Sequence, residues 1–179
     1  MAFNIDEFKS ALKHGGARAS LFQVTVTTPP IGDLTNLKFL CKTTSIPPST
    51  LTSFEVPYLG RSIKVAGERT FAEWSTTIIN DEDFGIRNSL EQWMNLIKSH
   101  REIKQNNPTV REYQKDITLD QYNKSGNVIK SYKFINAWPT TIAEIPLDTG
   151  SADIEEFTCT WNYDYWESDL EARKGGPPS

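Results

Sequence analysis

The side chains that could do acid–base or metal chemistry are two histidines and two short runs of carboxylates. His14 and His100 each stand at a predicted helix end, with no cysteine or acid at zinc-ligand spacing beside either. Glu155 and Glu156 are neighbours in a predicted strand, so they point to opposite faces and cannot share one glycosidase-like site. The other run, residues 81–83, is what an acidic chain supplies by chance. These residues predict no catalytic or metal site.

The glycines do not predict a nucleotide site either. Gly60 and Gly67 are not followed by the GK[ST] sequence of a phosphate-binding loop. The pair Gly15-Gly16 precedes a predicted strand, whereas a phosphate site needs the start of a helix. We therefore expect neither enzymatic activity nor a cofactor.

Length and charge favour one globular domain that does not bind nucleic acid tightly. The 179 residues are near the usual size of a single domain, which buries about two-thirds of its unfolded surface. Nineteen basic and 23 acidic side chains give a formal net charge of −4, opposite to that of most nucleic-acid-binding proteins. Cys41 and Cys159 are far apart and predict reduced, packed thiols. The longest apolar runs are too short for a membrane span, and Asp6 and Glu7 interrupt any signal peptide, so no membrane anchoring is expected.

Two helices are predicted among many strands. The first begins at Asn4 and ends at Gly15-Gly16, with apolar residues at helical spacing between them. The second follows Asp81 and carries an Arg87–Glu91 pair four residues apart. One face of this second helix is apolar and should pack on a sheet: it comprises Ile86, Leu90, Trp93, Met94 and Ile97.

Alternating apolar and polar residues predict the strands. They run over residues 22–27 and 37–42, a hairpin over residues 112–135 that turns at Ser125-Gly126-Asn127, and a closing strand over residues 157–165. The resulting fold class is mainly β, a β-rich α+β protein. It is an antiparallel β-sandwich or open barrel with a packed α-helix, plus a short N-terminal helix.

Several short motifs stand in an order that resembles the tail tube proteins of T4-like contractile phages. The most informative segment is residues 60–83, GRSIKVAGERTFAEWSTTIINDED, and the resemblance spans roughly residues 17–167. The other motifs, in chain order, are Leu21-Phe22-Gln23-Val24, Cys41-Lys42, Ile46-Pro47-Pro48, Trp138-Pro139-Thr140 and Asp164-Tyr165-Trp166-Glu167.

The resemblance implies a structural subunit of the inner tail tube, assembled in the host cytoplasm and located in the virion. Its expected partners are further copies in hexameric rings that stack into a conduit, the tail sheath, baseplate and terminator proteins, and DNA that passes without specific binding. Six copies at −4 each would carry −24 per ring, which either repels DNA from the bore or keeps the outer surface soluble. The alternatives are a baseplate tube-initiator, a tail terminator, a secretion-system tube protein, or a carbohydrate-binding β-sandwich module.

Candidate contacts between subunits or rings lie in and before the family-like segment. We predict that charged residues cluster here and form salt bridges across a subunit or ring boundary. The plainer interpretation is a charged surface hairpin whose turn is permitted by glycines. The segment Ser45–Pro57 cannot be a central strand along its whole length because proline donates no ladder hydrogen bond, so we predict an extended loop that reaches a neighbour. The candidates are Arg61, Lys64, Glu68, Arg69, Pro47, Pro48 and Phe54.

The tryptophans and the C-terminus complete the predictions. Core or interface packing is expected for Trp74, Trp93, Trp138, Trp161 and Trp166, whereas the carbohydrate-binding alternative needs an exposed aromatic row. Residues 1–167 are predicted to form the single tail-tube-like domain. Residues 168–179 end in Gly-Gly-Pro-Pro, which predicts a flexible C-terminal extension.

Overall fold

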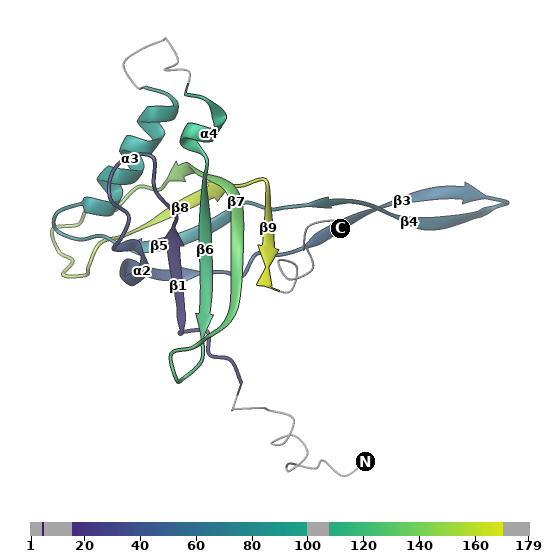
Figure 1. Cartoon of the computed structure of the whole chain (residues 1–179), viewed down its shortest axis with the longest axis horizontal. Helices are drawn as coiled ribbons and strands as arrows, with labels where there is room; N and C mark the ends of the chain where they lie inside the picture. The colour runs from purple at the N-terminus through teal and green to yellow at the C-terminus, as the bar shows by residue number, and fades with distance from the viewer. Residues whose placement is uncertain (1–4, 6–15, 100–107, 170–179) are drawn as a thin grey trace, which may run out of the picture.

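The computed structural model describes residues 5, 16–99 and 108–169, and these contain nine strands and three helices (Figure 1). The strands are β1 (Phe22–Val26), β2 (Cys41–Thr44), β3 (Thr50–Tyr58), β4 (Arg61–Thr70), β5 (Trp74–Ile79), β6 (Lys115–Tyr122), β7 (Val128–Ile142), β8 (Glu156–Asn162) and β9 (Tyr165–Ser168). The helices are α2 (Leu37–Leu40), α3 (Gly85–Ile97) and α4 (Val110–Tyr113). The predicted mainly β class is confirmed.

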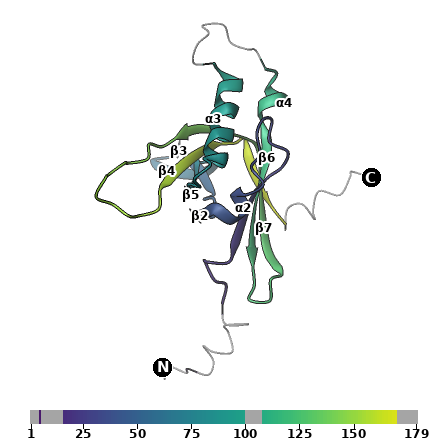
Figure 2. The same ribbon diagram turned by 90° about the vertical axis from the view of Figure 1, so that its left-hand side faces the viewer.

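Seven strands form one antiparallel sheet that bends at its longest member, β7. The order is β1-β6-β7-β8-β5-β2, and β9 also pairs with β7. The first part of β7 pairs with β6 and β9, and its last residues pair with β8. The two halves of the sheet therefore cross steeply and enclose the core between them (Figures 1 and 2). The two halves face each other as in the predicted sandwich, and they belong to one continuous sheet as in the predicted open barrel.

Aromatic side chains fill the core between the two halves. Trp74 stacks on Phe134 with ring centroids 4.2 Å apart, and Trp93 meets Trp161 edge to face at 5.8 Å. Trp74, Trp93 and Trp161 are buried, and the partly buried Trp138 and Trp166 pack against the same cluster. All five tryptophans thus lie in or against the core.

Helix α3 covers the sheet as predicted. Ile86, Leu90 and Trp93 are buried on its inner face, and Arg87 Nε lies 3.0 Å from Glu91 Oε1. The predicted N-terminal helix, apart from Ile5, and the basic residues at positions 100–101 lie outside the described residues. Within the described ranges, no helix has the length and apolar character needed to cross a membrane.

The strand predicted over residues 37–42 is wrong for its first part. Leu37 to Leu40 form the helical turn α2, in which the Leu40 amide donates to the Asn36 carbonyl over 3.1 Å. In a strand, Leu37 and Phe39 would share a face. Here Leu37 is fully buried while Phe39 is 73% exposed, because residues two apart lie on opposite sides of a helix. Only the residues from Cys41 onward pair with β5.

The closing strand and the β6–β7 hairpin are close to their predictions. The hairpin is confirmed from Lys115 onward, although residues 112 and 113 belong to α4. The closing strand is interrupted: Tyr163 is buried, but the chain turns at Asp164, so Tyr165 begins β9 and is exposed. Strand β9 continues through Ser168, and Asp169 Oδ2 accepts a hydrogen bond from the Ser131 amide over 2.9 Å. Strand pairing thus continues to Ser168, and residues 170–179 of the predicted C-terminal extension lie outside the described residues.

Candidate assembly surface

Strands β3 and β4 form a long hairpin that projects from the body of the subunit (Figure 1). The two strands pair only with each other, and every residue of β3 and all of β4 except Gly67 are exposed. The expected loop over residues 45–57 is therefore wrong from Thr50 onward, where the chain is a strand. The proline argument still holds, because β3 has a strand partner on one side only. An isolated two-stranded hairpin is only marginally stable in water.

One face of the hairpin is apolar. Cross-strand partners lie on the same face, and the register pairs Phe54 with Val65 and Val56 with Ile63. We call this the apolar face; it consists of Phe54, Val56, Tyr58, Ile63 and Val65, which are 41% to 63% exposed. Glu55 and Lys64 share the opposite, polar face. The alternation of apolar residues in both strands was the sequence signal for this surface, and the sequence prediction used only its Phe54.

The four charged candidates do not form one cluster. Arg61 lies opposite Tyr58 on the apolar face. Lys64 lies on the polar face, 3.8 Å from Glu55, and Arg69 pairs with Leu51 on the same side of β3 as Glu55. Glu68 stands at an irregularity in the register, where its carbonyl accepts a hydrogen bond from Thr52 over 3.0 Å. Within the described residues, Arg61, Glu68 and Arg69 form no salt bridge.

Glycines shape the hairpin at two points, as the plainer of the two interpretations predicted. Leu59 and Gly60 form the two-residue tip with φ of +44° and +80°, the left-handed conformation that tight hairpin turns require. At Gly67, a Cβ atom would lie 2.5 Å from Thr52 Oγ1, so only glycine lets the two strands approach there. Among the prolines predicted to make contacts, Pro48 is exposed but Pro47 is buried in its own subunit.

Three aromatic side chains of the body hold the base of the hairpin. Trp74 Nε1 donates to the Ser45 carbonyl over 2.8 Å, and Trp166 Nε1 donates to the Pro48 carbonyl over 3.3 Å. The Tyr163 hydroxyl donates to the Ala72 carbonyl over 2.7 Å, and burial raises the pKa of this tyrosine, which keeps it protonated. The sequence predicted packing for these residues but gave no signal of their backbone partners.

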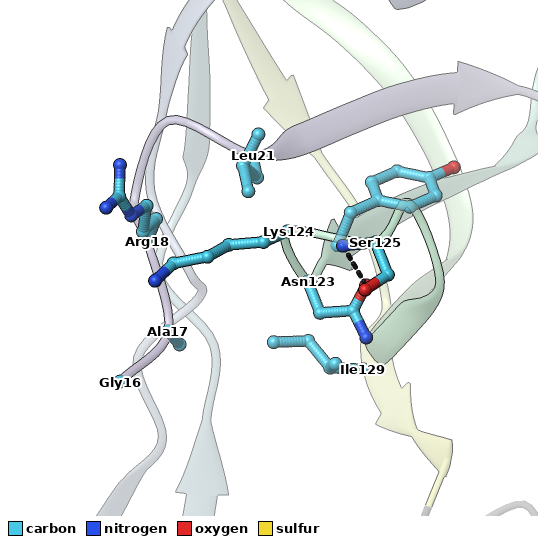
Figure 3. A pocket seen from close by; sticks show the side chains of 9 residues that line it. Gly16, Ala17, Arg18, Leu21, Asn123, Lys124, Ser125 and Ile129 are labelled. Carbon is cyan, nitrogen blue, oxygen red and sulfur yellow. Dashed lines mark hydrogen bonds between the residues drawn. The ribbon is translucent and has the colours of Figure 1, made fainter. Parts of the chain in front are cut away.

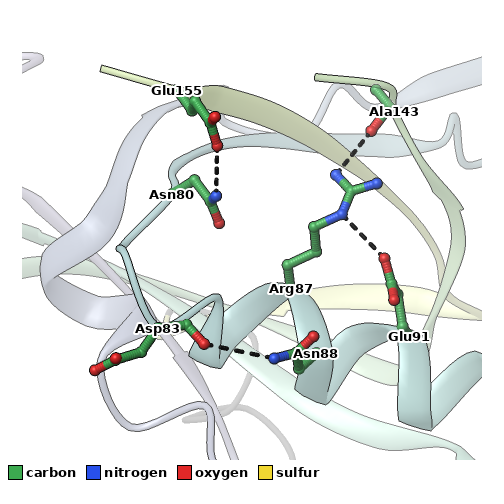
Figure 4. A network of polar contacts seen from close by, with 7 residues as sticks. All are labelled: Asn80, Asp83, Arg87, Asn88, Glu91, Ala143 and Glu155. Atoms are coloured by element: carbon green, nitrogen blue, oxygen red, sulfur yellow. Dashed lines mark hydrogen bonds and ion pairs between the residues drawn. The ribbon is translucent and has the colours of Figure 1, made fainter. Parts of the chain in front are cut away.

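A second prominent feature is the loop between β7 and β8, residues 143–155, whose ends are fixed to the start of α3 (Figure 4). Arg87 Nη1 donates to the Ala143 carbonyl over 3.1 Å. Asn80 Nδ2 donates to Glu155 Oε2 over 2.8 Å, and the Asn80 amide donates to the Glu155 carbonyl. Glu156 instead pairs with Lys42, so the two neighbouring glutamates have different partners.

A cavity lies beside the β6–β7 turn and is shown in Figure 3. Its volume is about 420 Å³, and Arg18 and Lys124 bring two cations to it. The turn itself is held by Asn123, whose Oδ1 accepts a hydrogen bond from the Ser125 amide over 2.9 Å. Most of the lining residues are exposed, so the cavity is an open surface depression.

The two cysteines are free thiols that are packed into the structure, as predicted. Burial raises the pKa of Cys41 to about 12 and raises the pKa of Cys159 further. Both therefore remain protonated at neutral pH and behave as small apolar side chains.

An exposed apolar face of this kind is typical of proteins that assemble with other chains. The sequence matches the phage tail tube protein family over residues 6–169, and the chain belongs to this family. It is 33% identical over 167 residues to the tail tube protein gp19 of Enterobacteria phage T4, covering 91% of this chain and 99% of that protein. It is 31% identical over 167 residues to the tail tube protein of Serratia phage KSP90, covering 89% of this chain and 93% of that protein. The protein is thus a structural subunit of a contractile phage tail tube, a component of the virion and not an enzyme.

Solved structures show the same fold at lower sequence identity. A chain from the PVC extracellular contractile injection system, in its extended sheath-tube complex, has a TM-score of 0.65 at 20% identity, covering 90% of this chain and 96% of that one. A chain from the sheath/tube terminator of the same system has a TM-score of 0.64 at 20% identity, covering 86% and 96%. Relatives with this fold therefore occur in sheath-tube and terminator complexes.

Proposed function

We propose that copies of this subunit join through the β3–β4 hairpin into hexameric rings, and that the rings stack into the hollow tail tube. The observation that carries this proposal is the exposed apolar face, which the subunit's own core does not cover. The repeated tube subunit is favoured over an initiator or terminator because the match covers 99% of a tail tube protein of the same size class.

The sheath, baseplate and terminator proteins are the further partners of the tube in this proposal. Chains with the same fold come from a sheath-tube complex, a sheath/tube terminator and a contractile baseplate, which supports these partners. DNA passes through the bore without specific binding, and the net charge of −4 per subunit is consistent with weak contact to phosphates.

Electron microscopy of the concentrated, tag-free protein in negative stain tests the proposal, with light scattering on the same sample to give its mass. Hollow rods or six-fold rings with a stain-filled centre are expected. A protein that remains monomeric even when short tube fragments are added as seeds would contradict it. Binding to a glycan array by such a monomer would favour the carbohydrate-binding alternative instead.

Charge reversal on the hairpin is the first mutational prediction. The double variant Arg61→Glu/Arg69→Glu should fold and remain soluble but form no tubes, because both arginines are exposed on the projecting hairpin. Assembly is measured by sedimentation and electron microscopy after mass spectrometry confirms the substitutions. The matched control is Arg18→Glu/Lys124→Glu, which reverses two exposed cations beside the β6–β7 turn. Full assembly of the hairpin variant would show that Arg61 and Arg69 do not take part in the interface.

A further inference from the structure

The β7–β8 loop encloses an acidic groove. Its volume is about 880 Å³, and its lining includes Leu147, Asp148, Asp153 and Ile154. Residues 143–156 contain five acidic side chains and no basic one. Leu147 and Ile154 are 82% and 71% exposed, so the groove presents apolar side chains next to carboxylates. We call this the acidic groove.

The carboxylates at the outer part of the loop are available for a partner. Lys42 enters the groove but pairs with Glu156, and Glu155 is occupied by Asn80. Asp148 and Asp153 are exposed and form no salt bridge within the described residues. The bonds from Arg87 and Asn80 fix both ends of the loop, so the groove keeps its place on the body. A positioned groove with unpaired anions suits a partner that brings a cation and apolar side chains together.

The tip of the hairpin has this chemistry. Tyr58 and Leu59 are 63% and 87% exposed, and Arg61 follows them on the apolar face without an acidic partner on that face. The tip therefore offers two apolar side chains and one cation in a few consecutive residues. These are the counterparts of Leu147, Ile154 and the exposed aspartates of the acidic groove, whose side chains accept hydrogen bonds, among the described residues, only from Gly150 and Ser151 of the same loop.

The two surfaces lie at opposite sides of the subunit. In Figure 1 the hairpin extends to the right, while the yellow-green β7–β8 loop lies at the left edge of the body. A subunit cannot fill its own groove in this arrangement. Complementary surfaces at opposite ends form a heterologous, head-to-tail contact, which generates closed rings or open stacks.

We infer that the hairpin tip of one copy inserts into the acidic groove of a second copy, with Arg61 facing Asp148 and Asp153. This inference rests on the proposed self-assembly and names the two surfaces that meet. Tyr58 and Leu59 pack on Leu147 and Ile154, which removes the most exposed apolar side chains of both surfaces from water. The contact is polar at its edge and apolar at its centre, as stable protein interfaces are.

A cysteine cross-link tests the contact directly in the full-length protein. The double variant Leu59→Cys/Leu147→Cys is allowed to assemble, oxidised and run on a non-reducing gel, where a ladder of covalently linked copies is expected. Each single variant is the matched control and should give at most one linked pair. Cys41 and Cys159 contribute little because burial keeps both protonated.

Charge exchange provides the second, independent test. Asp148→Lys/Asp153→Lys should raise the protein concentration needed for assembly by about tenfold or more, and Arg61→Glu added to it should restore assembly. Glu82→Lys/Asp83→Lys, two exposed changes outside the loop, controls for the same change in net charge. Tubes that form normally with the reversed loop, and no ladder from the double-cysteine variant, would overturn the contact while leaving the tube function intact. Absence of assembly by the unmodified protein would overturn the proposed function instead.

Discussion

At the scale of single residues, Asn136 allows the main sheet to bend. It lies within β7 with φ of +57°, a left-handed conformation that few residues other than glycine and asparagine tolerate. Its Nδ2 donates to Asp164 Oδ2 over 2.6 Å, and its amide donates to Asp116 Oδ1 over 3.3 Å. Asp116 also pairs with Lys133 at 2.7 Å. The two halves of the sheet are thus joined where β7 turns and the chain enters β9.

Substitution of Asn136 separates backbone strain from the lost hydrogen bond. Asn136→Ala should lower the free energy of unfolding by roughly 1–2 kcal/mol, since alanine disfavours positive φ and cannot bond Asp164. Asn136→Gly keeps the backbone conformation and should lose less. Urea denaturation followed by tryptophan fluorescence gives both values. Equal losses for the two variants would show that the left-handed conformation is not the source of the effect.

At the scale of elements, the hairpin differs from every strand of the main sheet. Its backbone hydrogen bonds are exposed, and its side chains contribute nothing to the hydrophobic core. Local stability is low where apolar contacts are few and backbone bonds are solvated. The hydrogen bonds from Trp74, Trp166 and Tyr163 fix its base, so we expect the distal part of the hairpin to have the lowest local stability in an unassembled subunit.

Hydrogen exchange should therefore distinguish the hairpin from the core. In unassembled protein, the amides of residues 51–69 should exchange at least about tenfold faster than those of β8, and assembly into tubes should protect them. The unassembled sample is the Arg61→Glu/Arg69→Glu variant, and the β8 amides serve as the internal control because they are paired on both sides in either state. Protection of the hairpin amides that does not change on assembly would contradict its role as a contact element.

The same comparison of elements shows what the sequence could predict. Long periodic segments such as α3 and the β6–β7 hairpin were found because their apolar faces follow one period throughout. Residues 37–42 were assigned to a strand because four residues are too few to separate the two periods, and the turn at Asp164 depends on the distant Asn136. The hairpin's apolar face is visible as alternation in the sequence, but its exposure follows from the tertiary fold. The acidic groove likewise depends on how Arg87 and Asn80 hold the loop.

At the scale of the whole molecule, a head-to-tail contact gives the assembly a direction, because each subunit has two different binding ends. The hairpin at one side and the acidic groove at the other must each find a copy, so every assembled subunit uses two different surfaces. A subunit with one damaged surface can still join through the intact one. It then presents a surface to which no further copy can bind.

This polarity predicts that one-sided variants act as terminators. Tyr58→Asp/Leu59→Asp damages the tip, and Leu147→Asp/Ile154→Asp damages the groove; all four side chains are exposed, so folding should be preserved. Either variant is mixed in equal amounts with the unmodified protein and should shorten the tubes several-fold in electron micrographs. The reason is that the contact would bury an unpaired carboxylate at its apolar centre, which is unfavourable. The variant with all four substitutions is the control: it has no intact surface, cannot join, and should leave tube length unchanged. Equal shortening by the four-fold variant would mean that the acids act through non-specific repulsion, and the head-to-tail contact would fail.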